Sequence, residues 1–529
     1  MSSLQWHILG GNNKHNIGAN SGLCVYEYED EKGKTCRKVL LFDAGVLQGD
    51  KNKPEYPSLA QSDTILPDYA RFLYKADDPS HKPEMPIDSI FLTHNHSDHS
   101  GALPMLILMG YKLPKIYATP YTARRLQQDL SNEGIDPAEW PKIYTIAPGK
   151  DIQEGPVDVK AFWVSHSTPQ SVGFFIDTPD GTILHTGDFK LDQSVLWGPA
   201  FNEQQFKRVV SKPVDLLLLD STGANKDVNA VTEHDMREAL HDVIAENPGK
   251  RIVVALMSGY EENLASVAQV AAEEKRTLWV AGAAHEQSLA ALRDTGLTMS
   301  DQLGVKVDVR ILGSRRTARD LAQKAPQDSV VVVTGSQGHA NAALTRAAEG
   351  RHNALSLDPA KDVILFCAPT MPGQVGQRNK LLATLKSKGF TVLTNNDLPL
   401  YPPSHARLPE IIEMVKLADP KHVLPIHGSR LLRKACAEAV EKMGRKAVQA
   451  DNGDVIKVSH RTSKSISPET KGRAPMIGLK TLQGTNWSDR YYIQVSAPEK
   501  KIPAKAGQKN AKQPANANKQ PRPRIFKID

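Results

Sequence analysis

A short run of histidines with an aspartate carries the clearest chemical signal in this sequence. The run reads His94-Asn95-His96-Ser97-Asp98-His99 and directly follows residues 89–93, an apolar segment that predicts a buried strand. An extended backbone points side chains two residues apart to the same side, so the first two histidines should converge. Imidazole nitrogens and carboxylate oxygens are the ligand types of catalytic zinc. Four side chains cannot surround two metal ions, so further ligands are needed.

Three more candidate ligands stand where predicted strands end. His166 follows the apolar run 161–164, Asp188 lies beyond the strand at 182–186, and His427 follows residues 423–426. A lone histidine is more often structural than a ligand. These three side chains nevertheless share one location, the carboxyl end of a strand, and we expect them to complete the metal centre.

The elements that must position these residues fall into two patterns. Residues up to about 210 predict strands and turns with some helix, including a helix at 102–109. From about residue 212, buried strands alternate with helices, which is typical of a parallel α/β sheet. Strands are expected at 215–220, 251–256, 277–281, 329–334 and 363–367, and helices at 232–247, 261–274 and 285–294. Thr232 with Asp235 resembles a capping box at a helix start. After about residue 400 the pattern returns to short strands and one helix, at 428–443.

Size, cysteine usage and hydropathy limit the class of protein. A chain of 529 residues suggests two to four domains. The four cysteines (Cys24, Cys36, Cys367 and Cys436) form no CxxC pair, so reduced thiols are expected rather than disulfides or a thiolate zinc site. The N-terminus lacks a signal-peptide pattern, and no apolar run approaches the roughly 18 residues of a membrane span. We expect a cytoplasmic protein that does not enter the membrane.

Positive charge is concentrated at the C-terminal end. Residues 498–529 hold nine basic residues against two acidic ones, a net +7 that equals the formal charge of the whole chain. This segment has almost no large apolar residues and is predicted to be disordered. A basic tail beside a neutral body could bind RNA or another acidic partner, or could simply aid solubility.

The motifs together resemble the metallo-β-lactamase superfamily. Its HxHxDH signature is met by the His94–His99 run, and its later ligands are matched by His166 and Asp188. Asp220-Ser221-Thr222, His405 and His427-Gly428 resemble the three motifs of the β-CASP nucleases within that superfamily. Residues 334–338 and 185–190 are similar to segments of bacterial ribonuclease J.

The resemblance implies an α/β fold, a metallo-β-lactamase αββα sandwich with an inserted β-CASP α/β domain. The sandwich would comprise residues 1–210 and 396–460, and the insertion residues 211–395. A short extension at 461–497 and the disordered basic tail would follow.

The resemblance also implies a ligand set and a mechanism. One zinc ion would be held by His94, His96 and His166, a second by Asp98, His99 and His427, with Asp188 bridging them, although Mn²⁺ or Mg²⁺ could also occupy such a site. The catalytic candidates are Asp220, His405 and Asp98, the last in addition to its role as a metal ligand. His405 would protonate the leaving 3′-oxygen or donate to the transition-state phosphate, and Asp220 would orient a histidine.

Contacts to RNA are predicted with less support from the residues themselves. The turn Gly335-Ser336-Gln337-Gly338 precedes a helix expected near residue 341, and its amides could bind a phosphate, although a plain loop is the commoner explanation. Ser404 and Arg407 are further candidates. The family's Ser-Gly-His run reads Pro403-Ser404-His405 here, and its Gly-Arg-Ser run reads Gly282-Ala283-Ala284. Recognition of a 5′-monophosphate is therefore open, with Arg407, Arg315 and Arg316 as candidates for the missing arginine.

The leading hypothesis is a zinc-dependent ribonuclease that cleaves single-stranded RNA as an endonuclease and could also act as a 5′→3′ exonuclease. A homodimer or tetramer is possible, although the family's C-terminal oligomerisation domain is reduced here. The alternatives are a β-CASP DNA-repair nuclease, a small-molecule metallo-hydrolase and a non-catalytic RNA-binding scaffold. The large insertion argues against a small-molecule enzyme, and the intact ligand set argues against a scaffold.

Overall fold

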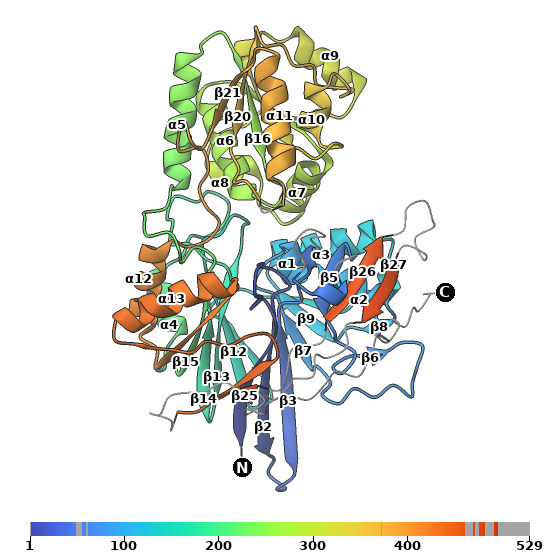
Figure 1. The fold of residues 1–529 in the computed structure, drawn as a ribbon, viewed down its shortest axis with the longest axis vertical. Helices are drawn as coiled ribbons and strands as arrows, with labels where there is room; N and C mark the ends of the chain where they lie inside the picture. The colour runs from blue at the N-terminus through green and yellow to red at the C-terminus, as the bar shows by residue number, and fades with distance from the viewer. Residues whose placement is uncertain are drawn as a thin grey trace, which may run out of the picture.

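The chain folds into a two-sheet sandwich and a separate α/β layer that stands above it (Figure 1). The computed structural model describes residues 2–48, 55–59, 62–371, 373–460, 469–470, 476–481 and 491–495. The basic tail at 498–529, predicted to be disordered, lies outside these residues.

The sandwich consists of an eight-stranded and a seven-stranded sheet. The first has the order β10 (Ile143–Thr145), β9 (Lys115–Ala118), β7 (Ser89–Phe91), β3 (Thr35–Phe42), β2 (Ser21–Glu29), β1 (Ser3–Gly10), β24 (Asp454–Val458) and β25 (Glu469–Thr470). The second has the order β11 (Asp151–Glu154), β12 (Val157–Trp163), β13 (Val172–Thr178), β14 (Gly181–His185), β15 (Leu216–Asp220), β22 (His422–Ile426) and β23 (Lys446–Ala447).

Aromatic side chains join the two sheets. Phe42 and Phe91 of the first sheet stack with ring centroids 5.1 Å apart, and Phe174 of the second sheet meets both at 5.5 and 5.7 Å. All three rings are buried. Aromatic burial of this kind dominates the energetics of a core and fixes the two sheets against each other. Because β3 and β7 end at the metal motif, this packing also fixes where that motif lies.

Helices cover both outer faces, which completes the predicted αββα arrangement (Figure 1). The first sheet is covered by α1 (Ser97–Ser100), α2 (Ala102–Leu108) and α3 (Pro120–Asn132), and the second by α4 (Glu203–Val209), α12 (Leu408–Ala418) and α13 (Arg430–Lys442). The expectation of a single helix after residue 400 was wrong. Ile411, Met414, Val415 and Ala418 of α12 are buried at helical spacing, so the signal was present and was missed.

The inserted layer is a six-stranded, fully parallel sheet. Its order is β18 (Val309–Ile311), β17 (Thr277–Ala281), β19 (Ser329–Thr334), β16 (Arg251–Leu256), β20 (Asp362–Phe366) and β21 (Thr391–Thr394). One face packs on α5 (Glu233–Glu246), α6 (Glu261–Glu273), α7 (Ala283–Asp294) and α8 (Met299–Leu303), the other on α9 (Arg315–Gln323), α10 (Ala343–Ala348) and α11 (Val375–Ser387). The predicted capping box is present, with Thr232 and Asp235 bonded in both directions.

Strand β15 corrects one expectation about this layer. The boundary placed at residue 211 assigns it to the insertion, whereas it pairs in parallel with β14 and β22 of the sandwich. A wholly buried run such as Leu216–Asp220 has the same apolar pattern in either sheet, so the sequence could not choose between them.

Pieces of the predicted C-terminal extension return to the sandwich. β25 pairs with β24, and β26 (Met476–Thr481) pairs with β5 (Thr64–Pro67) near the start of the chain. β27 (Tyr491–Val495) and β4 (Leu47–Gln48) complete this smaller sheet. Among the described residues, no helix has the length and apolar character needed to cross a membrane.

Candidate metal centre

The candidate ligands meet because their strands end at the same edge of the sandwich. In the second sheet β12, β14, β15 and β22 run in one direction, and His166, Asp188, Asp220 and His427 lie at or just beyond their carboxyl ends. In the first sheet β3 and β7 run parallel, and Asp43 and the His94–His99 run follow them. Functional groups commonly gather at the carboxyl ends of parallel strands.

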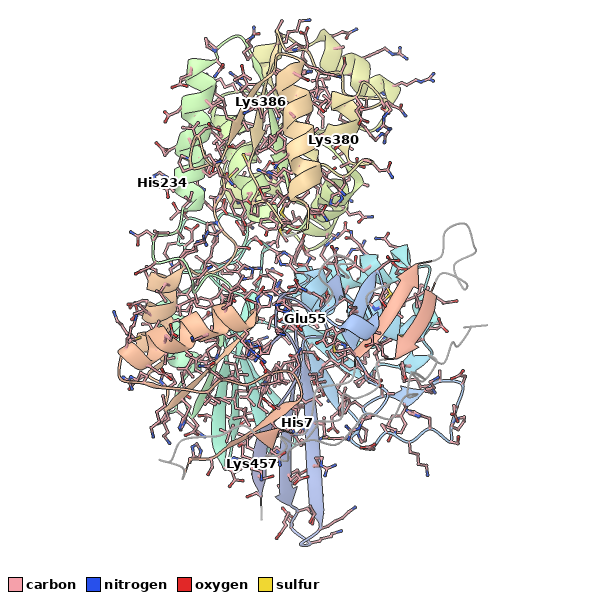
Figure 2. All side chains as sticks on the ribbon, in the orientation of Figure 1. His7, Glu55, His234, Lys380, Lys386 and Lys457 are labelled. Atoms are coloured by element: carbon pink, nitrogen blue, oxygen red, sulfur yellow. The ribbon has the colours of Figure 1, made fainter. Side chains whose placement is uncertain are left out.

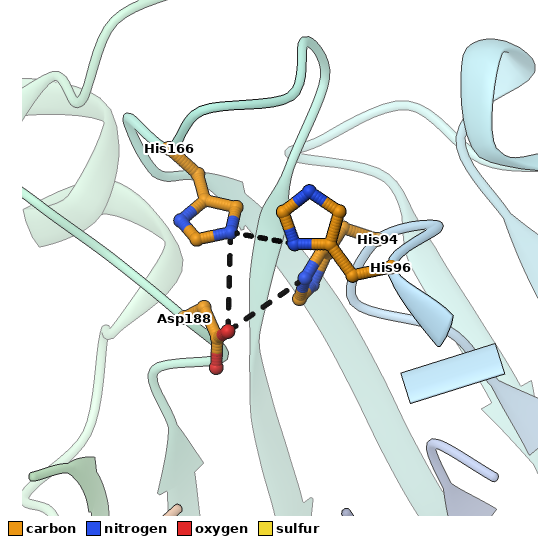
Figure 3. A group of neighbouring side chains, drawn as sticks. All are labelled: His94, His96, His166 and Asp188. Atoms are coloured by element: carbon orange, nitrogen blue, oxygen red, sulfur yellow. Dashed lines mark hydrogen bonds and ion pairs between the residues drawn. The ribbon is translucent and has the colours of Figure 1, made fainter. Parts of the chain in front are cut away.

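His94, His96, His166 and Asp188 form one group of convergent ligand atoms (Figure 3). Nε2 of His166 lies 3.2 Å from Nδ1 of His96. Oδ2 of Asp188 lies 3.7 Å from Nε2 of His94 and 3.8 Å from Nε2 of His166. These separations suit ligands that share one ion at about 2.0–2.2 Å.

Asp98, His99 and His427 form a second group, on the other side of Asp188. Oδ2 of Asp98 lies 3.0 Å from Nε2 of His427 and 3.8 Å from Nε2 of His99. Oδ2 of Asp188 lies 3.2 Å from Nε2 of His99, so one carboxylate oxygen faces both groups. The structure thus brings together the residues of the two implied ligand sets, and Asp188, Asp220, His405 and His427 form a third convergent group; which of them bind metal stays a prediction.

The donor chemistry of both groups fits divalent ions. Nε2 of His94 is buried and has no hydrogen-bond partner among the described residues, as expected of a nitrogen that can bind a metal. Its ring centroid lies 4.1 Å from that of His99 and 4.7 Å from that of His166. Burial, with the neighbouring histidines, holds the pKa of His94 well below its usual value, so this imidazole is neutral and able to bind a metal.

The carboxylates of the centre are ionised. Burial opposes ionisation of Asp188, but the nearby histidines, His427 and His99 first, outweigh it and hold its pKa well below the usual value. Burial likewise opposes ionisation of Asp98, and His99 and His427 more than offset it. The site therefore presents negative charge that a divalent cation would neutralise.

Two side chains that the sequence did not single out contact the candidate ligand His99. Oδ2 of Asp43 accepts a hydrogen bond from Nδ1 of His99 at 2.7 Å and another from Thr93 at 2.8 Å. Nδ2 of Asn20 lies 3.0 Å from Nε2 of His99. A carboxylate behind a metal-binding histidine fixes its tautomer and raises its basicity. The sequence did carry a signal for Asp43, since this residue directly follows a buried strand, as the candidate ligands do.

Asp220 contacts two histidines at once. Its Oδ2 lies 2.8 Å from Nδ1 of His405 and its Oδ1 lies 3.3 Å from Nδ1 of His427. Burial opposes its ionisation, but His405 and His427 hold its pKa well below the usual value. Thr222 adds a contact of 2.6 Å between its hydroxyl and Nδ1 of His427. The first, second and third β-CASP motif residues thus form one connected cluster.

The inserted layer and the returning chain touch the first metal group directly. Nε2 of His96 donates to the carbonyl oxygen of Gly259, just beyond β16, at 2.8 Å. Nδ1 of His166 donates to the carbonyl oxygen of Ser404 at 2.8 Å. Each ring therefore keeps its other nitrogen for the metal, and the two parts of the molecule are joined at the site.

Three of the side chains that were predicted to contact RNA are buried. Ser336 and Gln337 are buried, and Gln337 is engaged internally, donating to Pro369 and accepting from the amide of Met371. The amide of Gln337 is thus occupied within the protein, while the role predicted for Ser336 stays a prediction; its hydroxyl accepts a hydrogen bond from Gln337. Ser404 is also buried, and Arg407 stands at the start of α12, where its amide donates to Glu410.

Comparisons with known proteins agree with this architecture. A family model described as a β-lactamase superfamily domain matches residues 65–254, and one described as the ribonuclease J β-CASP domain matches residues 249–385. Ribonuclease J of Sinorhizobium meliloti is 31% identical over 461 residues, covering 86% of this chain and 75% of that protein. Ribonuclease J of Thermus thermophilus is 28% identical over 479 residues, covering 89% and 77%. A solved structure of a protein of unknown function from Enterococcus faecalis V583 superposes with a TM-score of 0.60 at 17% sequence identity. The match covers 86% of this chain and 100% of that chain, and it supports the fold alone.

Fold and site together define a metal-dependent hydrolase of the metallo-β-lactamase type that carries a β-CASP nuclease insertion. Within that class, the chain belongs to the ribonuclease J family, as its sequence motifs had predicted.

Proposed function

We propose that this chain is a two-metal endoribonuclease that cleaves single-stranded RNA and holds two Zn²⁺ ions, one in each ligand group. The observation that carries the proposal is the pair of convergent ligand sets that share Oδ2 of Asp188. Divalent ions bound there would supply Lewis-acid activation of water and would neutralise charge on the phosphate. The first group would be His94, His96 and His166, and the second Asp98, His99 and His427.

His405 is proposed to act on the leaving group. Its Nδ1 is held by the ionised Asp220, so the proton of that nitrogen points at the carboxylate and Nε2 is left for the substrate. The side chain is 19% exposed, whereas His94, His99, His166 and His427 are buried, and it can therefore meet RNA. A histidine so oriented can protonate the departing 3′-oxygen or donate to the phosphate in the transition state. Asp220 is a positioning residue for His405 and His427.

The inserted layer is proposed to guide RNA across the metals. The carboxyl ends of its parallel strands face the sandwich, as the contact of Gly259 with His96 demonstrates for β16. We propose that residues from about 221 to 395 form this domain and that the strand passes between the two layers. A cytoplasmic location is consistent with the four cysteines, all of which are free thiols. A homodimer or tetramer stays a prediction.

The test is cleavage of matched RNA and DNA oligomers by metal-reconstituted protein. RNAs of one sequence with 5′-monophosphate, 5′-triphosphate or 5′-hydroxyl ends should give the same internal products if the enzyme is an endonuclease. Products that shorten from the 5′-end, and only with a monophosphate, would indicate an exonuclease. Preferred cleavage of DNA would contradict the proposal.

Two variants assign the roles in the same assay. Asp98→Ala combined with His99→Ala should abolish cleavage and lower the bound metal, while RNA binding stays measurable. His405→Gln should keep the metal content and lower kcat by roughly 10²–10⁴-fold, the range for loss of a general acid. Undiminished cleavage by the double variant would overturn the metal assignment.

A further inference from the structure

An arginine in the inserted layer is buried without a negative partner. Arg378, in the first turn of α11, is 5% exposed. Among the described residues no carboxylate forms an ion pair with it, and burial lowers the pKa of its guanidinium. Lys380 and Lys386 of the same helix are exposed to solvent (Figure 2), so the burial of Arg378 is a property of its position. Buried charges in proteins are normally paired, because an unpaired charge is costly away from water.

The surroundings of Arg378 supply carbonyl groups and an aromatic ring. Its Nη1 donates to the carbonyl oxygens of Ser336 and Pro369, each at 3.2 Å, and its guanidinium lies 5.1 Å from the centre of the Phe366 ring. These contacts orient the guanidinium group but do not neutralise its positive charge. No hydrogen bond in the described chain engages Nε or Nη2 of this side chain.

The Gly335–Gly338 turn is packed against this arginine. A Cβ on Gly338 would lie 2.4 Å from the carbonyl oxygen of Gln377 and 2.9 Å from the amide nitrogen of Arg378. Both glycines have positive φ, +113° at Gly335 and +80° at Gly338, which a side chain would disfavour. The amide of Gly338 donates to the carbonyl oxygen of Gly335 at 3.0 Å, so the turn is closed on itself and holds the carbonyl oxygen of Ser336 against the guanidinium.

Arg378 and the metal centre share one edge of the molecule. Thr334 of β19 pairs with Leu256 of β16, and Phe366 of β20 pairs with Ala255 of β16. Gly259, which holds His96, follows the same end of β16. Neighbouring strands lie about 4.8 Å apart, so the arginine and the contact to the metal group lie along the same, carboxyl edge of the inserted sheet.

We propose that Arg378, held beside the Gly335–Gly338 turn, forms an anion subsite that binds a backbone phosphate of the substrate, away from the phosphate that is cleaved. This inference rests on the proposed function in RNA cleavage. It assigns recognition of the phosphate to Arg378 and not to Ser336 and Gln337. A guanidinium suits this task because its planar fork binds two phosphate oxygens at once.

A second buried arginine provides a matched control. Arg276 is 7% exposed, donates to the carbonyl oxygen of Lys250, and lies at the opposite, amino end of the inserted sheet. Burial lowers its pKa too, but Glu274 and Asp328 act in the opposite direction and offset its charge. The change of Arg276 to Gln therefore removes the same charge from a comparable environment that has no proposed RNA contact.

The experiment measures binding of a short single-stranded RNA to the full chain across a range of salt concentrations. R378Q should bind roughly tenfold more weakly at low salt, the expected loss of a charged hydrogen bond. Its plot of log K against log salt should be shallower by about 0.7, the contribution of one phosphate on a single strand. R276Q should match the wild type in affinity and slope.

A wild-type slope for R378Q would overturn the subsite, as would equal losses in R378Q and R276Q, which would mark a structural role. Melting temperatures identify a variant that fails to fold. In that case the R378K variant is measured, because lysine keeps the positive charge but lacks the planar guanidinium. Severalfold weaker RNA binding by R378K supports the subsite, and binding equal to that of the wild type contradicts it. If the wild-type chain neither binds nor cleaves RNA, the proposed function itself fails, which is a different outcome.

Discussion

His96 donates a hydrogen bond from Nε2 to the carbonyl oxygen of Gly259 at 2.8 Å, which joins a proposed metal ligand of the sandwich to the inserted sheet. The bond fixes the tautomer of His96 and directs Nδ1 toward His166 and the first metal group. This partner of His96 comes from the β-CASP layer and not from the sandwich. The position of that layer over the site is thereby coupled to the geometry of the metal centre.

Gly259→Ala should disturb this coupling. Gly259 has φ +82°, and an added Cβ would lie 3.3 Å from Cδ2 of His96. The backbone strain alone should cost roughly 1–2 kcal/mol, which lowers the melting temperature. Displacement of the histidine should lower metal affinity or kcat by about tenfold, the lower end of the range for such partners. Gly249→Ala is the control, since nothing lies within 4 Å of its Cβ position. Equal effects of both changes would argue against the coupling.

Asp43→Asn tests the carboxylate behind His99. The change keeps the shape of the side chain and removes the charge that faces Nδ1 of His99 at 2.7 Å. Asparagine tolerates the positive φ of +57° at this position, so the backbone should be retained. Metal affinity should fall about 10–100-fold, measured by competition with a chromogenic chelator. Asp30→Asn in a surface turn should leave affinity unchanged, and a similar value for both variants would refute the role of Asp43.

Metal binding should release protons. In the metal-free chain burial lowers the pKa of His427, but Asp188, Asp220 and Asp98 outweigh burial and raise it to about 10. Burial also opposes protonation of His99, and Asp188, Asp43 and Asp98 again outweigh it, raising its pKa well above the usual value. Both rings are therefore protonated at pH 7, and ions that bind to them should displace about two protons. Calorimetric titrations in buffers of different ionisation enthalpy measure that number, and a value near zero would contradict this charge assignment.

The same pKa shifts predict how the stability of the metal-free chain depends on pH. A histidine whose folded pKa is raised contributes stability that is fully present below its unfolded pKa of about 6.5. That contribution is lost as pH rises through the folded value, about 10 for His427. The chelated protein should therefore melt at progressively lower temperature between pH 7 and pH 10. Asp98→Ala combined with His99→Ala should flatten this dependence.

Removal of residues 498–529 should weaken RNA binding. The segment holds nine basic residues, and each phosphate it contacts on a single strand contributes about 0.7 to the slope of log K against log salt. The truncated chain should therefore show lower affinity and a shallower slope, while a chain with the nine residues changed to Gln should behave like the truncation. An unchanged slope would mean that the tail makes no phosphate contacts.

The expected elements show where local patterns were sufficient. The strands at 251–256, 277–281 and 329–334 were predicted with the bounds that the structure has, because buried parallel strands are continuous apolar runs between helices of clear periodicity. Helix α12 was missed although its apolar spacing was visible. β15 was identified as a strand, but its sheet was assigned wrongly, since pairing partners far apart in the chain leave no local trace.

The sequence by itself determined the family and proposed the ligands, including their spacing in the His94–His99 run, because metal chemistry restricts such positions to a few residue types. Only the tertiary structure decided which residues stand behind the ligands. The contacts of Asp43 with His99, of Gly259 with His96 and of Arg378 with the carbonyl oxygen of Ser336 join segments 56, 163 and 42 positions apart. Aspartate, glycine and arginine are common residues that serve many purposes, so their roles appear only when packing brings them to the site.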